Sequence, residues 1–486
     1  MAITAGGNLN SIPSPTQNAL NSNYIDFTVT AGSWAQQYLP DLMEREAEVF
    51  GNRTVSGFLS QVGAEEAMTS DQVVWSEQAR LHLAYTGTID VSNSQFTITA
   101  HAGTNATYTE NEHGLRLGDV CVVASSTVTY VGRITVDDAS DVITILPYEF
   151  AHSTGTGMVD GAATVLKIGS EWAKGSDTPY TTANEPSHTS FTNKPVIIRD
   201  MYHVSGSDAS AIGWVEVSGE DGANGYLWYL KAEGETRMRF ADNCEMQVLE
   251  GVRGLAASTL DTGVNFLVGP IAGSTGTSFG TQGLFDAISD RGNASSGITG
   301  VNAATDLAEF DAILAEFDSQ GAIEENMMFV NRSTSLAMDD MLASMNSYGA
   351  GGTSYGVFNN SEDMALNLGF SGFRRGSYDF YKSDWKYLND AGTRGAINSR
   401  AVADAIRGVI VPAGVSSVYD QQLGKNLKRP FLHVRYRASA TDDRKFKTWV
   451  TGSVGAETSE LDAMRVNYLS ERCLITQGAN NFMLLN

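Results

Sequence analysis

Hydrophobic and polar positions follow two different periods along the chain, and the changes of period divide it into segments. Apolar residues recur at helical spacing over 34–50, 225–251 and 305–320. Alternation of apolar and polar residues over 72–85 predicts a half-buried strand. From 430 onward the chain again has the pattern of strands, with MRVNYLS and ERCLITQG predicted as two of them. These patterns predict an α+β fold in which a few long helices lie among many strands.

The longest helical pattern is GYLWYLKAEGETRMRFADNCEMQVLEG at 225–251, which predicts one amphipathic helix ending at Gly251. Its predicted apolar side carries Leu227, Leu230, Gly234, Met238, Ala241 and Val248. A glycine inside a helix costs about 1 kcal/mol relative to alanine. Gly234 therefore predicts either the close approach of a strand or a bend in the helix.

A β-rich segment, 86–175, interrupts what otherwise looks like a long hairpin. It is rich in Thr, Val and Ile, and Gly, Asp, Asn and Ser break it into short strands, a pattern that predicts a small barrel or sandwich. The strand over 72–85 is expected to pair with KPVIIRDMYHVSGS at 194–207. The β-rich segment is therefore predicted to be a domain inserted into the loop of that hairpin.

A mixed α/β unit is predicted over 305–345. Its first helix has the apolar face Leu307, Phe310, Ile313, Leu314 and Phe317. Gly321 is expected to end that helix, and MMFV to form a short buried strand. Ser333 or Thr334 is the expected N-cap of the second helix.

The charge is strongly acidic but unevenly distributed. With 56 acidic and 32 basic residues the net charge is −24, which disfavours a sequence-independent grip on nucleic acid. The segment 425–447 is an exception, with eight basic and two acidic residues: its basic residues are Lys425, Lys428, Arg429, Arg435, Arg437, Arg444, Lys445 and Lys447. It is either a solvated strand face or a docking surface for an acidic segment of another copy, such as 41–50 with Glu44, Glu46 and Glu48.

Catalytic and metal-binding patterns are missing from the sequence. No two histidines have the i, i+4 spacing of a zinc site, and no phosphate-loop or nucleophile-elbow motif occurs. The triplet Asp261-Thr262-Gly263 follows an expected helix end and is interpreted as a turn. Arg374 and Arg375 suit a phosphate or a stacked base, or a salt bridge across a subunit contact. We expect no cofactor, no metal and no enzymatic activity, and three buried, unpaired cysteines.

The order of these parts resembles the HK97-type major capsid protein of tailed bacteriophages. The resemblance rests on KPVIIRDMYHVSGS with the long helix, on AEFDAILAEFDSQGAIEENMMFVNRSTSLAMDDM, and on NYLSERCLITQGANNFMLL. It implies the following domains: an N-terminal arm with short helices (1–70), extended-loop strands (71–85 and 186–215), the inserted β-domain (86–175), the spine helix of the peripheral domain (216–260), an axial α/β domain (261–425) and peripheral-domain strands (426–486).

The resemblance also implies a function and partners. It predicts a structural protein that self-assembles into hexamers and pentamers of an icosahedral virion shell enclosing double-stranded DNA. A separate scaffolding protein, a portal and a decoration protein are the implied partners, without sequence-specific DNA binding and without a membrane. The first 20 residues lack a secretory pattern, so assembly is expected in a host bacterial cytoplasm. The alternatives are a phage tail, baseplate or surface-layer protein, and a β-rich enzyme.

Overall fold

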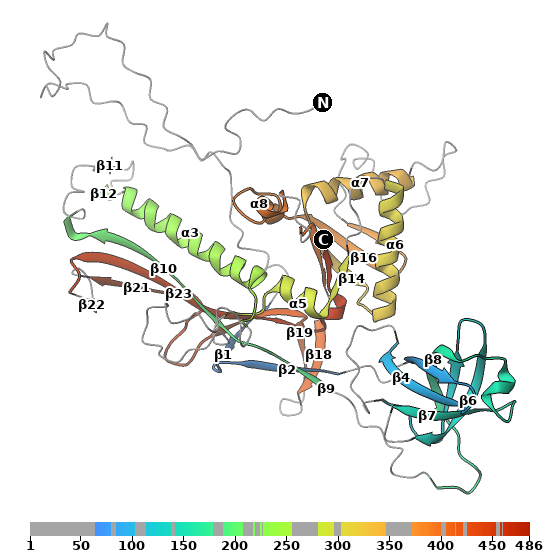
Figure 1. Ribbon diagram of the computed structural model, residues 1–486. Coiled ribbons are helices and arrows are strands. Elements are labelled where there is room, and N and C mark those ends of the chain that lie inside the picture. Colours follow the sequence, from blue (N-terminus) through green and yellow to red (C-terminus); the bar gives the residue numbers. More distant parts are fainter. Residues whose placement is uncertain are drawn as a thin grey trace, which may run out of the picture.

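The computed structural model places two sheets with their helices and a separate barrel (Figure 1). The residues it describes are 64–78, 84–102, 113–137, 141–177, 188–207, 217–218, 224–225, 227–254, 280–295, 303–346, 372–399, 405–413, 415–420, 425–452, 457–458 and 460–486. For 217–218, 224–225, 227–231, 303–306, 342–346, 415–420, 425–430 and 457–458 only the backbone is described. The expected arm and helix over 1–50, with Glu44, Glu46 and Glu48, and the triplet at 261–263 lie outside these residues.

The first sheet is built around one long strand, β23 (Ala463–Thr476). The antiparallel strand β10 (Val196–Ser205) pairs along one edge of β23, and β21 (Lys447–Gly452) and β20 (Leu432–Arg437) pair along the other. Two further strands complete this sheet: β1 (Ala64–Met68), parallel to β20, and β22 (Glu457–Thr458), parallel to β21. The helix α3 (Leu227–Glu250) runs across one face of this sheet (Figure 1).

Aromatic packing holds α3 on the sheet. Phe240 is fully buried, with its ring centroid 5.1 Å from that of Phe446 and 5.8 Å from that of Tyr468. Cys244 lies one turn further along α3 and is buried with them. Aromatic pairs at these distances add stabilisation beyond the apolar area that they bury. A salt bridge between Arg239 and Asp200, with Nη2 and Oδ2 3.0 Å apart, joins α3 to β10 at the surface.

The second sheet lies between two layers of helices. Its order is β13 (Asn293–Ser295), β24 (Met483–Leu485), β17 (Gly408–Pro412), β14 (Glu325–Val330), β16 (Tyr378–Asp384) and β15 (Gly372–Arg375). On one side α6 (Ala303–Gln320) and α7 (Arg332–Asn346) pack against it, and on the other α5 (Leu284–Arg291) and the end of α3 do. Every residue of β17 is buried, which explains its unbroken apolar run GVIVP.

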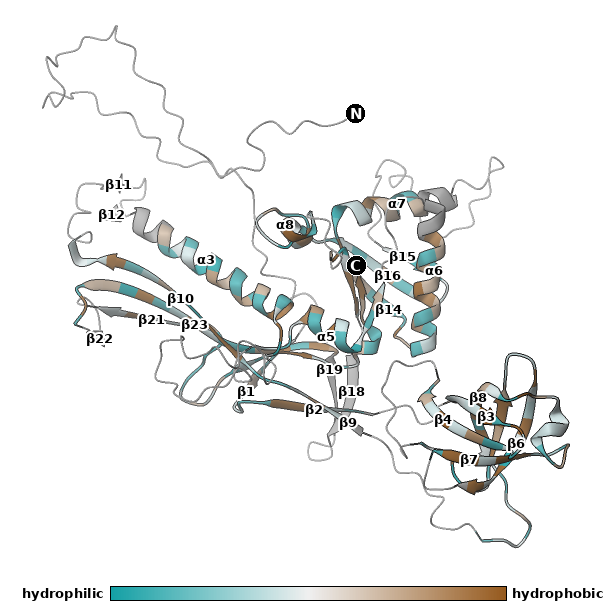
Figure 2. Cartoon of the chain, in the orientation of Figure 1, coloured by the Kyte–Doolittle hydropathy of each residue, from teal (hydrophilic) through white to brown (hydrophobic). Residues whose placement is uncertain are grey.

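The third unit is a closed six-stranded barrel. Its strands are β3 (Ala84–Asp90), β4 (Gln95–His101), β7 (Val142–Pro147), β6 (Thr129–Asp137), β5 (Asp119–Ala124) and β8 (Gly161–Ser170), in spatial order. Buried and partly exposed residues alternate along β5 and β7, and Figure 2 shows hydrophobic and hydrophilic residues interspersed along the strands of the barrel. The ribbon of β2 (Val73–Gln78) and β9 (His188–Asn193) leads to the barrel, which lies apart from both sheets (Figure 1).

Shorter elements connect these units. They are the strand pairs β11 (Val217–Ser218) with β12 (Asn224–Gly225) and β18 (Val415–Asp420) with β19 (Lys425–Pro430), the helix α8 (Gly395–Asn398), and the 3-10 turns η1 (Ser153–Thr156), η7 (Lys386–Leu388) and η8 (Ala479–Asn481).

Several predicted elements are confirmed. The helix α6 buries Phe310, Ile313 and Phe317 as its periodicity predicted, and Gly321 follows it with a φ of 66°. The predicted MMFV strand is part of β14. The cap of α7 is a correction, because Asn331 holds that position rather than Ser333 or Thr334. The Oδ1 atom of Asn331 accepts a hydrogen bond from the backbone N–H of Thr334 at 2.8 Å.

Two predicted strand arrangements are wrong. The strand β2 pairs with 188–193 rather than 194–207, and β10 pairs with β23 instead. The segments MRVNYLS and ERCLITQG, predicted as two strands, form one, because β23 runs continuously through both. Ser470 and Glu471 can lie inside that strand because both have polar partners there: Ser470 Oγ donates a hydrogen bond to the carbonyl oxygen of Lys445 at 2.7 Å.

Candidate assembly surface

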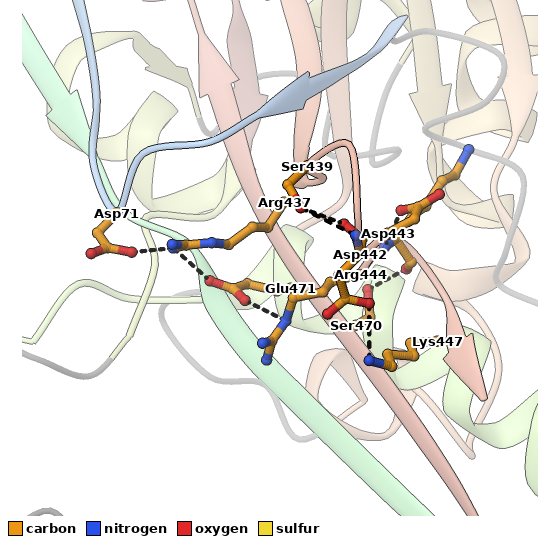
Figure 3. Close-up of polar contacts among 10 residues, drawn as sticks. Asp71, Arg437, Ser439, Asp442, Asp443, Arg444, Lys447, Ser470 and Glu471 are labelled. Atoms are coloured by element: carbon orange, nitrogen blue, oxygen red, sulfur yellow. Dashed lines mark hydrogen bonds and ion pairs between the residues drawn. The ribbon is translucent and has the colours of Figure 1, made fainter. Parts of the chain in front are cut away.

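Two arginines of the basic segment, Arg437 and Arg444, form an ion-pair network around Glu471 (Figure 3). This carboxylate lies on β23 with 6% of its side chain exposed. One oxygen is 2.8 Å from Arg444 Nε, and the other is 3.4 Å from Arg437 Nη1. Arg437 also pairs with Asp71, which raises the pKa of the Arg437 guanidinium. The network joins β23, the end of β20 and the turn after β1.

The strand β1 is joined to β20 by side chains as well as by backbone pairing. Glu66 Oε2 lies 3.0 Å from Arg435 Nη2, and Glu65 pairs with Lys445. These pairs are partly exposed, so each contributes about 0–1 kcal/mol. The strand β1, which lies near the end of the predicted N-terminal segment 1–70, is thus an edge strand held by parallel pairing and by several weak ion pairs.

The cations of the basic segment whose side chains are described have partners within their own chain. Lys447 Nζ lies 2.9 Å from Asp442 Oδ1, in a turn where Ser439 Oγ accepts the backbone N–H of Asp442 at 3.1 Å. This arrangement favours the solvated-face interpretation for the residues whose side chains are described. The side chains of Lys425, Lys428 and Arg429 lie outside them. Docking of the segment 41–50 from another copy stays a prediction.

The arginine pair on β15 also has partners within the chain. Arg374 Nε lies 3.5 Å from Asp379 Oδ1, and Arg375 pairs with Asp311 of α6. Their predicted role in a subunit contact is untested, and their charges are met by carboxylates of the same chain. We therefore see no described feature that favours a phosphate at this position.

The buried side of the long helix differs from the predicted one. Thr236, Phe240, Cys244 and Val248, spaced by four residues, face the interior. Val248 was predicted correctly, whereas Met238 is 52% exposed and Ala241 is half-buried. The side chains of Leu227 and Leu230 lie outside the described residues.

Gly234 was predicted to allow a strand to approach closely, and this is wrong. A Cβ atom at Gly234 would meet no atom within 4 Å. At Gly251, by contrast, a Cβ would lie 2.4 Å from the carbonyl oxygen of Gln247. The predicted end of the helix therefore lies where only glycine fits, and a bend remains the untested explanation for Gly234.

Polar residues that the sequence patterns missed join the end of α3 to η7 and to the start of α8, which follow β16 in the chain. Glu250, the last residue of α3, accepts a hydrogen bond from Tyr387 Oη at 2.9 Å and pairs with Arg394. Burial and the charge of Glu250 raise the pKa of Tyr387 well above its usual value. A carboxylate at a helix C-terminus interacts unfavourably with the helix dipole, so a glutamate at the end of this amphipathic helix was a signal that a cation lies nearby.

A second missed cluster holds the base of the β2–β9 ribbon. Arg291, at the end of α5, stacks its guanidinium 4.4 Å from the ring centroid of Phe191 and 5.5 Å from that of Trp75. Burial lowers the pKa of Arg291. Glu77 accepts hydrogen bonds from Trp75 Nε1 and from the backbone N–H of Gly478, both at 3.0 Å. The ribbon that leads to the barrel therefore begins at a fixed point.

Buried Asn193 completes this fixed point. Its Nδ2 donates hydrogen bonds to the carbonyl oxygens of Leu474 at 2.7 Å and Gln282 at 3.0 Å. Its Oδ1 accepts the backbone N–H of Gln282 at 3.0 Å. One side chain thus satisfies backbone groups of β23 and of the turn before α5. Buried backbone groups of this kind are costly to leave without a hydrogen bond.

The described residues contain no group of His, Cys, Asp and Glu arranged to hold a metal. Burial raises the pKa of the thiols of Cys121 and Cys473 to about 12 and raises that of Cys244, so all three are poor nucleophiles. Within the part of the chain that the structure describes, no helix is both long enough and apolar enough to cross a membrane.

Comparison with known proteins gives structural matches alone. No protein-family model matches the chain, and no curated protein matches it. The chain is similar to the mature capsid of bacteriophage PhiM1 (8% identity, 92% of this chain, 91% of that chain, TM-score 0.37). It is also similar to the capsid of the cyanophage P-SCSP1u (7%, 92% and 92%, TM-score 0.37) and to a structure from Mycobacterium phage Ogopogo (8%, 92% and 96%, TM-score 0.40). Because these TM-scores lie below 0.5, the function is inferred from the chain's own residues.

Proposed function

We propose that this chain is the major structural subunit of an icosahedral phage shell, in which hexamers and pentamers enclose double-stranded DNA. The observation that carries the proposal is the arrangement of α3 over a sheet completed by a strand from far along the chain. A helix-backed sheet, an α/β unit and a projecting ribbon with a barrel offer a subunit several distant surfaces for contact with neighbours.

The domains follow from this proposal. The helix α3 with β10, β21 and β23 is the peripheral domain, and the second sheet with α5, α6 and α7 is the axial domain. The β2–β9 ribbon is the extended loop, and the barrel is its inserted domain. The chain is a building element rather than an enzyme, which agrees with the buried, protonated thiols and with the ion-paired carboxylates described above.

The charge of the chain suits an enclosed genome. A subunit with a net charge of −24 repels DNA over most of its surface, so the genome can move during packaging. A separate scaffolding protein, a portal and a decoration protein are the partners of this proposal, with assembly in the bacterial cytoplasm. Tight binding of duplex DNA by isolated shells at physiological salt would count against it.

Expression of the full chain followed by electron microscopy and analytical ultracentrifugation tests the proposal. Shells, or free pentamers and hexamers, are the expected products. Tubes, flat sheets or trimeric fibres would instead favour the alternative of a tail, baseplate or surface-layer protein. A monomer that hydrolyses polysaccharide would favour the enzyme.

A further inference from the structure

The outer surface of the barrel carries a continuous apolar row. Val131 of β6 is paired with Val122 of β5, which is paired in turn with Leu166 of β8. Tyr148 extends the row, because its backbone N–H donates to the carbonyl oxygen of Val131 at 3.2 Å. Tyr148, Val131 and Leu166 are 51%, 42% and 46% exposed. We call these four residues the barrel row; contiguous exposed apolar surface of this kind marks interaction sites.

Acidic groups border the barrel row. Glu149 follows Tyr148 and is exposed, and the exposed carboxylate of Glu171 accepts a hydrogen bond from the Tyr148 hydroxyl. Over residues 84–177 the sequence has 11 acidic and 4 basic residues, a net charge of −7. Two barrels therefore repel each other, and the row is suited to a surface that is apolar and basic.

The first sheet has such a surface on the face away from α3. Ile198 and Tyr202 of β10 point toward Phe240 of α3. Residues alternate in direction along a strand, so Ile197, Arg199, Met201 and His203 point to the opposite side. Their partners on the same side include Arg465 in β23 and Trp449 in β21. We call this side the open face.

The open face combines exposed apolar side chains with cations. Ile197 is 52% exposed and Met201 is 54% exposed, next to the exposed Arg199 and His203. Arg199 and Arg465 have no carboxylate partner among the described residues, unlike Arg437 and Arg444 in the Glu471 network. The open face thus has both properties that the barrel row requires of a partner surface.

We infer that the barrel row of one copy docks on the open face of a neighbouring copy, an inference that rests on the proposed shell function. The β2–β9 ribbon carries the barrel away from the sheets of its own chain (Figure 1), so its partner is a second molecule. The contact joins two different surfaces and is therefore heterologous. Contacts of this type close into rings when their rotation closes, as a hexamer or pentamer requires.

The size of the two surfaces suits reversible assembly. A row of four side chains is smaller than the roughly 800 Å² per partner of a stable pairwise interface. Each contact is therefore weak alone, and ring closure makes the contacts collectively strong. Misplaced subunits can dissociate before the ring closes.

Two variants of the full chain test the inference. The first carries Val131→Asp and Leu166→Asp in the barrel row, and the second carries Arg199→Glu and Met201→Asp on the open face. All four substituted residues are exposed. Circular dichroism checks that each variant is folded. Each variant alone is expected to lose at least about tenfold of its assembled fraction in sedimentation velocity.

Mixing the two variants gives the decisive result. The intact barrel row of the open-face variant can still dock on the intact open face of the barrel-row variant. An equimolar mixture is therefore expected to form discrete heterodimers and no rings. Val159→Asp, at a 68% exposed residue of the barrel outside the row, is the matched control and is expected to assemble like the wild type. A mixture that stays monomeric, or a variant that assembles normally alone, would overturn the inference.

The same experiment separates this inference from the proposed function. Wild-type shells together with normally assembling variants would overturn the docking and leave the shell function standing. Heterodimers from the mixture, together with wild-type fibres or sheets instead of shells, would support the docking and contradict the shell function.

Discussion

The barrel and the helix-backed sheet bury their apolar residues in opposite ways. The barrel closes on itself, so Phe96, Ile134 and Ile145 are fully buried without help from another unit. The first sheet has α3 on one face, while Ile197 and Met201 on the other are more than half exposed. A closed barrel has no unpaired edge and needs no cover. The comparison teaches that the barrel is complete as a monomer, whereas the sheet is only half covered.

The largest expected effect comes from removing one buried ring in each unit. Phe96→Ala in the barrel and Phe240→Ala in α3 should each cost about 3–5 kcal/mol of unfolding free energy, because both side chains are fully buried. Hydrogen exchange resolved by segment should show that each change loosens its own unit. Phe150→Ala, at a 43% exposed barrel residue, is the control. Equal loosening of both units by either change would show that they unfold together.

A smaller effect is expected from the network that anchors the sheet. Glu471→Gln leaves Arg437 and Arg444 without a buried anion and should cost about 1–3 kcal/mol, measured by urea denaturation. The cost should shrink at high salt. Asp379→Asn is the matched control, because its partner Arg374 has 62% of its side chain exposed, and about 0–1 kcal/mol is expected there. A Glu471 variant as stable as the control would show that the network is incidental.

The buried thiols predict how the unfolding free energy of each unit depends on pH. The pKa of Cys121 in the barrel and of Cys473 in the sheet is about 12 in the folded chain, above the ordinary value. Unfolded thiols lose their protons first as the pH rises past about 8.5. Each thiol then lowers the unfolding free energy by about 1.4 kcal/mol per pH unit until the pH reaches its folded pKa.

Urea denaturation at pH 8 and pH 10 measures this slope. Cys121→Ala should reduce the fall in unfolding free energy with rising pH for the unfolding transition of the barrel. Cys473→Ala should do the same for the unfolding transition of the sheet. An unchanged slope in both variants would mean that the thiols are not shielded in the folded chain.

The smallest effect concerns the helix on the sheet. Gly234→Ala should raise the unfolding free energy by up to about 1 kcal/mol, because the added methyl group meets only open space. If Gly234 serves a bend, shells of the variant should mature incompletely or change in size, which electron microscopy would reveal. Gly251→Ala is the destabilising counterpart. Normal shells from Gly234→Ala would exclude the bend.

Elements whose pattern and packing agree were predictable from the sequence. The apolar spacing of α6 gave its buried face, because Phe310, Ile313 and Phe317 are large and have no competing stripe. The unbroken apolar run GVIVP likewise matches a strand in which every residue is buried. In both cases the local pattern and the tertiary environment impose the same arrangement, so little depends on distant residues.

The predictions failed where residues distant in the sequence determine the local structure. The stretch around Ser470 and Glu471 was predicted as two strands, yet Lys445, Arg437 and Arg444, which are near only in space, satisfy these polar residues inside the single strand β23. The predicted face of α3 was displaced because Phe240 has its aromatic partners on other elements. The candidate surface was only partly predictable: the basic segment was found, but its carboxylate partners and the open face depend on strand register.

The length of β23 has a consequence for synthesis of the chain. The strand β10 remains without its antiparallel partner until residues 463–472 have left the ribosome. Contacts so far apart in sequence form slowly. The open face is therefore created late, when the barrel, whose residues all lie within 84–170, has had time to fold. A nascent chain can therefore present a finished barrel before it has a surface to receive one, so a ring cannot close through an incomplete subunit.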